Sequence, residues 1–145
     1  MESRKRLRIV HDTGAILAGL PLRLPAYMVS NYTTKSVVSE VLDRESRALL
    51  ERMLETGILE VSEPSAEGLR KARRAADKAG VGGRLSRTDL EVLALAIDIS
   101  ASGGETVIAT DDYSLQRAAL AAGIGFQRVR YRGIGRGGRG RRARR

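Results

Sequence analysis

The segment of residues 87–101, RTDLEVLALAIDISA, places the strongest constraint on the fold. Its apolar residues recur at helical spacing and occupy nearly the whole circumference, so the helix has no broad polar face for solvent. Ser86 and Asp89 form an S-x-x-D pattern that is typical of a helix start. Such a helix is stable only when other elements cover it, which predicts an interior helix in a layered domain.

Short apolar runs alternate with helical segments along the rest of the chain. We expect strands at 6–11, 58–64, 105–110 and 124–130, and helices at 12–20, 35–57, 65–79, 86–101 and 114–122. Pro21 and Pro25 should end the first helix, and the second should break near Asp43. Residues 27–35 fit either a loop or a short strand, and residues 81–84 a loop. This alternation predicts an α/β fold, a three-layer α/β/α sandwich with a central, mainly parallel sheet.

Acidic residues follow two of the predicted strands directly. Asp12 comes after RLRIVH, and Asp111 and Asp112 come after TVIAT. Open parallel sheets bind ligands beyond the carboxyl ends of their strands, so these side chains should gather at one edge. Oxygen ligands of this kind suit Mg²⁺ or Mn²⁺. The chain has no cysteine and one histidine, which argues against zinc.

Each acid also has a purely structural interpretation. Asp12 and Asp112 could cap the helices that follow, and Asp89 could complete a capping box with Ser86. Glu40 lies beside the apolar arc of its helix, where most glutamates are simply solvated. The argument for function is therefore joint, since several acids stand at element starts that could converge. His11 should point to the opposite face from Asp12, which makes it a strand residue rather than a ligand.

The basic charge is concentrated at the end of the chain. Of the 26 lysines and arginines, nine are arginines in 128–145, which leaves 17 bases against 17 acids in residues 1–127. We expect a folded domain at 1–127 and a disordered tail at 128–145 that binds a polyanion, RNA especially. A solubilising tail is the alternative, although arginine serves solubility poorly. The expected RNA-binding residues are Arg128, Arg130, Arg132, Arg136, Arg139, Arg141, Arg142, Arg144 and Arg145.

Neither a membrane span nor a secretion signal is visible in the sequence. No stretch approaches the roughly 20 apolar residues that a span needs, and the segment MESRKRLRIVHD lacks an apolar signal region. We therefore expect a cytoplasmic protein without a membrane partner. The oligomeric state stays open, a homodimer included.

Four acidic segments occur in a characteristic order. They are HDTGAIL with Asp12, SEVLDR with Glu40, LSRTDLEVLALA with Asp89, and ATDDYSLQ with Asp111 and Asp112. In this order and context they resemble the motifs of the PIN domain, a metal-dependent ribonuclease fold, over about residues 7–126. The resemblance implies that residues 1–127 are a PIN-like nuclease domain.

The resemblance also implies roles for individual residues. Asp12, Glu40, Asp89 and Asp112 would be catalytic and would hold one or two Mg²⁺ or Mn²⁺ ions, directly or through water. Asp112 matches the T-x-D acid of the family, with Thr110 as its threonine, and Asp111 is the auxiliary metal ligand, although their order could be reversed. Thr13 and Ser86 could orient a carboxylate or phosphate, or serve as helix caps.

Within this family, RLSRTDLEVLALA and TDDYSLQ are most similar to the endonuclease that matures the 3′ end of small-subunit rRNA. That similarity implies endoribonuclease activity in rRNA processing and ribosome biogenesis, with rRNA or the pre-ribosomal small subunit as partner. Those enzymes normally continue into a cysteine-rich zinc ribbon. Here either the arginine-glycine tail replaces the ribbon, or the protein has a different duty. The alternatives are a toxin-type PIN ribonuclease and a non-catalytic RNA-binding or ribosome-assembly factor on a PIN scaffold.

Overall fold

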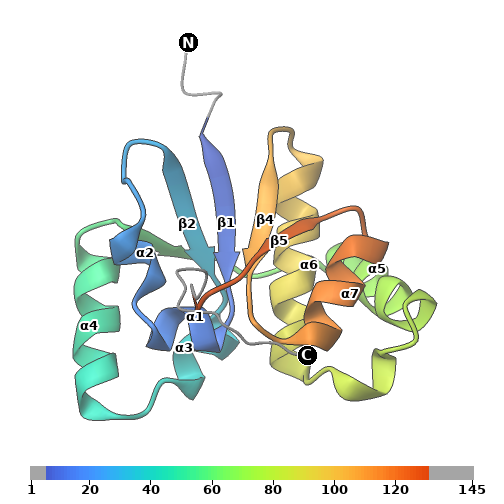
Figure 1. Cartoon of the computed structure of the whole chain (residues 1–145), viewed down its shortest axis with the longest axis horizontal. Helices are drawn as coiled ribbons and strands as arrows, with labels where there is room; N and C mark the ends of the chain where they lie inside the picture. The colour runs from blue at the N-terminus through green and yellow to red at the C-terminus, as the bar shows by residue number, and fades with distance from the viewer. Residues whose placement is uncertain (1–5, 131–145) are drawn as a thin grey trace, which may run out of the picture.

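The computed structural model describes residues 6–130 and contains a five-stranded sheet, drawn in Figure 1. The strands follow the order β3-β2-β1-β4-β5, and every pair of neighbours is parallel. Their bounds are β1 Leu7–His11, β2 Val29–Thr33, β3 Leu59–Val61, β4 Thr106–Ala109 and β5 Gly125–Gln127. The sheet therefore has the parallel arrangement that the alternating sequence predicts.

Helices α1 and α2 pack against one face of the sheet, and α3–α7 contribute to the core on the other face. In Figure 1, α1–α4 are seen at the β2 end of the sheet and α5–α7 at the β4–β5 end. Their bounds are α1 Thr13–Leu17, α2 Leu20–Arg23, α3 Lys35–Glu40, α4 Arg44–Glu55, α5 Ala66–Lys78, α6 Arg87–Ala101 and α7 Tyr113–Ala121, with a 3-10 turn, η2, at Gly82–Arg84. This arrangement is the expected three-layer α/β/α sandwich. Within residues 6–130, no helix combines the length and the apolar composition needed to cross a membrane.

Two local predictions about helix boundaries have different outcomes. Pro21 was expected to end a helix, but it stands in the first turn of α2, where its missing N–H removes no helical hydrogen bond. The helical stretch 35–57 does break as expected. Glu40 ends α3, and Asp43 begins α4 by accepting a hydrogen bond from the Ser46 backbone N–H at 3.0 Å. The ambiguous stretch 27–35 contains β2.

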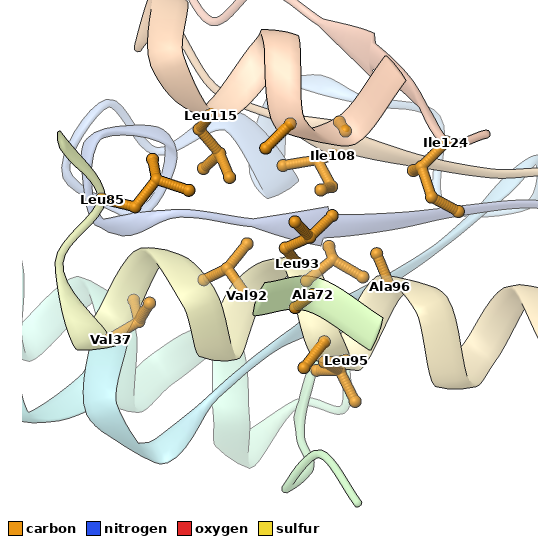
Figure 2. Packing of buried hydrophobic residues seen from close by; sticks show 14 of the residues in the cluster. Val37, Ala72, Leu85, Val92, Leu93, Leu95, Ala96, Ile108, Leu115 and Ile124 are labelled. Carbon is orange, nitrogen blue, oxygen red and sulfur yellow. The ribbon is translucent and has the colours of Figure 1, made fainter. Parts of the chain in front are cut away.

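Helix α6 is the interior helix that its sequence predicts. Five consecutive residues are buried: Val92, Leu93, Ala94, Leu95 and Ala96. Figure 2 shows Leu93 directed toward Ile108 of β4 and Leu115 of α7, whereas Leu95 points to the opposite side of α6. The capping box is also present, because Ser86 Oγ accepts from the Asp89 N–H and Asp89 Oδ2 accepts from the Ser86 N–H. Burial on both sides explains the absence of a polar face.

Alternate residues of the central strands pack on opposite faces of the sheet. Val10 and Ile108 belong to a large core with side chains of α3–α7. Ile9 and Ala109 belong to a smaller core with side chains of α1 and α2, and this core also contains Val129. Val129 is 4% exposed. The packed body therefore extends to Val129, a residue that composition alone assigns to the tail, whereas residues 131–145 lie outside the described part.

Helices α5 and α6 meet at a glycine. An added Cβ at Gly68 would lie 2.5 Å from Asp98 Oδ1 and 2.9 Å from the Ala94 carbonyl oxygen. The Asp98 carboxylate also accepts hydrogen bonds from the Ser65 N–H at 2.6 Å and from the Ser65 hydroxyl at 2.8 Å. The absence of a side chain at residue 68 is therefore what lets α6 approach the start of α5.

Candidate active site

The two central strands bring acidic residues to one edge of the sheet. Strands β1 and β4 are direct neighbours and pair His11 with Ala109, so the residues that follow each strand emerge together. The Asp12 N–H continues the ladder by donating to the Ala109 carbonyl at 3.2 Å. In Figure 1 the arrowheads of both strands point to the end of the domain where α1 and α3 lie. Asp12 and the Asp111–Asp112 pair therefore follow neighbouring strands at the same edge of the sheet.

Asp12 is a half-buried carboxylate at the centre of this edge. Its Oδ1 accepts a hydrogen bond from the Ala15 N–H at 2.8 Å, which caps α1. Burial raises the pKa of Asp12 above its usual value, and the negative charges of Asp89 and Asp111 raise it further. Hydrogen bonds from Thr110 and Ala15 oppose that rise without cancelling it. The side chain therefore serves both as a cap and as one of a group of mutually repelling acids.

Thr110 connects the two acidic loops. Its side chain is 0% exposed, and its Oγ1 accepts a hydrogen bond from the Asp112 N–H at 3.0 Å. Thr110 also acts on Asp12, because its side chain opposes the rise in the Asp12 pKa. The threonine of the T-x-D motif thus lies between the residue after β1 and the loop after β4.

Asp89 reaches the same region from the first turn of α6. Burial raises its pKa, and the negative charges of Asp112 and Glu40 add to the rise, while hydrogen bonds from Ser86 lower it. Ser86 takes the capping role that was one of its two expected functions. The charges that perturb Asp12 and Asp89 show that acids from four separate loops and helix ends share one electrostatic environment.

Glu40 is held by two threonines. At the end of α3, its Oε1 accepts a hydrogen bond from the Thr13 hydroxyl and its Oε2 accepts one from the Thr88 hydroxyl, each at 2.7 Å. Of the two expected roles of Thr13, orienting a carboxylate is the one the structure supports, since Asp12 is the α1 cap. The sequence reasoning missed Thr88. The only feature of the sequence that could have indicated Thr88 is its position directly before Asp89, the acid of the third motif.

Asp111 and Asp112 have different partners although they are adjacent. Asp112 Oδ1 accepts from the Leu115 N–H at 3.1 Å and caps α7, and within residues 6–130 no donor lies against its Oδ2. Asp111 uses both oxygens, because Oδ1 accepts from the Val129 N–H at 2.8 Å and Oδ2 from the Arg130 N–H at 3.2 Å. Of the pair, Asp112 is the acid with an uncommitted oxygen.

His11 lies inside the domain and away from the acidic edge. The ring is fully buried, and its Nε2 is 2.8 Å from Asn31 Oδ1. Burial lowers the pKa of His11 to about 4, so the ring is neutral at physiological pH. The expectation that His11 is a strand residue agrees with this placement.

The donor set of the edge consists of carboxylate oxygens, which suits a hard divalent cation. Among residues 6–130, no three side chains of histidine, cysteine, aspartate or glutamate lie close enough together to hold a metal ion as they stand. Burial is the largest cause of the raised pKa values of Asp12 and Asp89, and the negative charges of neighbouring acids add to it. The chemistry of these residues therefore fits a bound cation, which would relieve their repulsion.

Exposed basic and aromatic side chains surround the edge. Tyr113, the residue after Asp112, is 66% exposed, and the Arg117 guanidinium lies 5.9 Å from its ring centroid. Arg128 and Arg130 are exposed, and the Arg130 Nε lies 3.9 Å from Asp111 Oδ2. The other seven arginines expected to bind RNA lie outside the described residues. The described surface thus offers an aromatic face and two cations next to the acids.

Comparisons with known proteins agree with this geometry. A family profile described as "PIN domain of ribonuclease" matches residues 9–99, which include the end of β1, most of α6 and the first three acidic motifs. The chain therefore belongs to the PIN-domain family of ribonucleases, as its motifs indicate.

Individual relatives carry two different names. The chain is 52% identical to Ribonuclease VapC3 of Aeropyrum pernix over 128 residues, which span 88% of this chain and 90% of the relative. It is 41% identical to Endoribonuclease Nob1 of Pyrococcus abyssi over 129 residues, 89% of this chain and 72% of the relative. Nob1 of Methanothermobacter thermautotrophicus is 40% identical over 104 residues, 72% of this chain and 60% of the relative.

Proposed function

We propose that this protein is a metal-dependent endoribonuclease that hydrolyses RNA phosphodiester bonds at the carboxyl edge of its sheet. The observation that carries the proposal is geometric: Asp12 and Asp112 follow two paired strands, and Glu40 is hydrogen-bonded to Thr13 and Thr88, the neighbours of Asp12 and Asp89. Clustered, mutually repelling acids destabilise a fold, and such clusters are characteristic of functional sites.

These four acids would hold one or two Mg²⁺ or Mn²⁺ ions. Bound there, such cations would supply an activated water and would stabilise charge on the phosphoryl and leaving oxygens. Thr13 and Thr88 hold both oxygens of Glu40, and capping contacts hold one oxygen each of Asp12, Asp89 and Asp112 at helix starts. Because no three of these side chains lie close enough together as they stand, binding a cation would draw the carboxylates toward one another.

The surroundings fit single-stranded RNA. The exposed Tyr113 ring beside the active edge can stack on a nucleobase, with Arg117 fixed over it by a hydrogen bond to the Ala79 carbonyl at 3.1 Å. Arg128 and Arg130 offer phosphate contacts next to a site that would otherwise repel the RNA backbone.

Substitution of matched capping aspartates tests this proposal. Asp12→Asn should abolish Mn²⁺-dependent cleavage of a labelled single-stranded RNA and leave the fold intact, because asparagine caps about as well as aspartate. Asp43→Asn is the control, since Asp43 caps α4 through the same kind of contact but lies in no predicted metal site. Equal cleavage by wild type and Asp12→Asn, with contaminating nuclease excluded, would mean that Asp12 is not part of the catalytic site, whereas RNA binding by wild type without cleavage would favour a non-catalytic RNA-binding protein.

We propose the precursor of small-subunit rRNA as the substrate, with the pre-ribosomal small subunit as partner. The motifs RLSRTDLEVLALA and TDDYSLQ and the relatives named Nob1 support this choice. A toxin-type ribonuclease is the second candidate, because the 52% identical relative is named VapC3 and is matched over 90% of its length. Crosslinking of the protein to RNA in cells separates the two, since only the first predicts enrichment at the 3′ end of small-subunit rRNA.

A further inference from the structure

We propose that Asp111 is a positioning residue that anchors the start of the arginine-rich tail beside the acidic edge, so that the tail delivers RNA to the active site. This inference rests on the proposed function. It assigns Asp111 a role different from that of its neighbour Asp112, although the two acids belong to one motif.

The anchoring contacts use the whole Asp111 carboxylate. Its two oxygens accept hydrogen bonds from two successive backbone N–H groups, those of Val129 and Arg130, at 2.8 and 3.2 Å. The Arg130 Nε also lies 3.9 Å from Oδ2. Because backbone amides make the principal contacts, the carboxylate fixes the path of the chain rather than one side chain.

Packing fixes the same segment independently. Val129 is 4% exposed and belongs to the smaller core with Ile9 of β1 and Leu20 of α2. The Arg23 side chain also donates to the Val129 carbonyl, at 3.4 Å. After β5 the chain therefore runs back from the edge of the sheet toward the central strands. Its last buried residue within residues 6–130, Val129, lies next to the loop that carries Asp111 and Asp112.

Charge explains why this starting point matters. Seven arginines and no acid follow residue 130, whereas the active edge carries several carboxylates. Those carboxylates repel RNA phosphates, so an arginine-rich segment favours cleavage only if it holds RNA close to them. Fixing its origin beside Asp112 raises the effective concentration of bound RNA at the acids.

The proposal makes an unusual electrostatic prediction. Asp111→Ala removes a negative charge near the RNA, so simple charge effects predict tighter binding. Loss of the anchor predicts the reverse. We expect the KM for a labelled single-stranded RNA in Mn²⁺ to rise about tenfold, with kcat within roughly threefold of wild type. The Kd for the same RNA in chelator should weaken in parallel. Glu55→Ala removes an exposed charge on α4 and is the matched control, expected to match wild type.

Hydrogen exchange tests the anchor without RNA or metal. Exchange of the Val129 and Arg130 amides should be at least about tenfold faster in Asp111→Ala. In Asp111→Asn, which keeps one acceptor oxygen, the exchange rates of these two amides should lie between those of wild type and Asp111→Ala. This variant keeps the test valid if the alanine variant folds poorly. Unchanged exchange overturns the proposal.

A double-mutant cycle links the anchor to the tail in the full-length chain. When the seven arginines beyond residue 130 are replaced by glutamine, Asp111→Ala should no longer change KM or Kd. Faster amide exchange with unchanged KM and Kd means that Asp111 is only structural, and a collapse of kcat at unchanged KM means that it binds metal. Either result overturns the proposal, as does an equal effect of Asp111→Ala with and without the seven arginines. If the wild type binds RNA but does not cleave it, only the proposed function is refuted. The anchoring role of Asp111 can then still be tested by the effect of Asp111→Ala on the Kd for RNA.

Discussion

Removing the two threonine hydroxyls that hold Glu40 should weaken the response of the enzyme to Mn²⁺. Thr13→Val and Thr88→Val are nearly isosteric and delete one donor each, at 2.7 Å from Oε1 and Oε2. Ordering a glutamate side chain costs up to about 2 kcal/mol of rotamer entropy. In the wild-type protein, the two threonine hydrogen bonds offset part of that cost before any metal binds. Without them, metal binding must order the side chain.

The expected size of the effect follows from the two contacts. A hydrogen bond to a charged group contributes about 1.5–3 kcal/mol when buried, and the exposure of Glu40 reduces this to about 1 kcal/mol. Each single variant should therefore need about fivefold more Mn²⁺ for half-maximal cleavage, and the double variant about 30-fold more. Initial rates of cleavage of a labelled RNA, measured against Mn²⁺ concentration, give these values directly.

Three controls define what would refute this reasoning. Thr13→Ser keeps the hydroxyl and should stay within about twofold of wild type. Thr56→Val removes a surface hydroxyl that donates only within α4 and its end, so the metal response should be unchanged. A wild-type Mn²⁺ response in the double variant, or an equal loss in Thr56→Val, would mean that the threonines do not hold Glu40 as a ligand.

Three further perturbations probe charge and packing. Because folding raises the pKa of Asp12, ionisation of this residue destabilises the fold progressively as the pH rises from the unfolded-state pKa to the folded-state pKa, and the full cost is present at higher pH. Asp12→Asn should therefore melt higher than wild type in chelator, and by more at pH 7 than at pH 4; an equal difference at both pH values would contradict this. Mn²⁺ at 100 times its Kd should stabilise wild type by about 2.7 kcal/mol and Asp12→Asn by far less, as thermal unfolding would show, and equal gains would remove Asp12 from the metal site. Gly68→Ala should cost about 1–3 kcal/mol in urea unfolding, whereas Gly83→Ala, which meets nothing within 4 Å, should cost much less.

Much of the fold follows from local sequence patterns. The period of the apolar residues and the S-x-x-D pattern predict α6 and its capping box, and the acids after β1 and β4 predict the active edge. These features depend on residues within a few positions of one another, which is why they are visible in one sequence. Pro21 shows the limit of such rules, because proline can either end a helix or start one.

The features that were missed join distant segments. Thr88 reaches Glu40, 48 positions earlier, and Asp111 reaches Val129, 18 positions later. No periodicity reports contacts of this kind. The burial of Val129 was also not predictable from its neighbours, because a single valine between two arginines is typical of a charged tail. Its packing against distant residues makes it part of the smaller core.

The position of β1 between β2 and β4 determines when the site can form during synthesis. Strand β4 pairs Arg8 with Thr106, so the central contact of the sheet waits until most of the chain exists. Asp89 and Asp112 also come late, and all-parallel sheets lack the local hairpins that would let early segments fold alone. A chain still emerging from the ribosome therefore presents Asp12 and Glu40 without their partners. The four acids can come together only after residue 112 has been made, so a shorter nascent chain cannot present the assembled acidic edge.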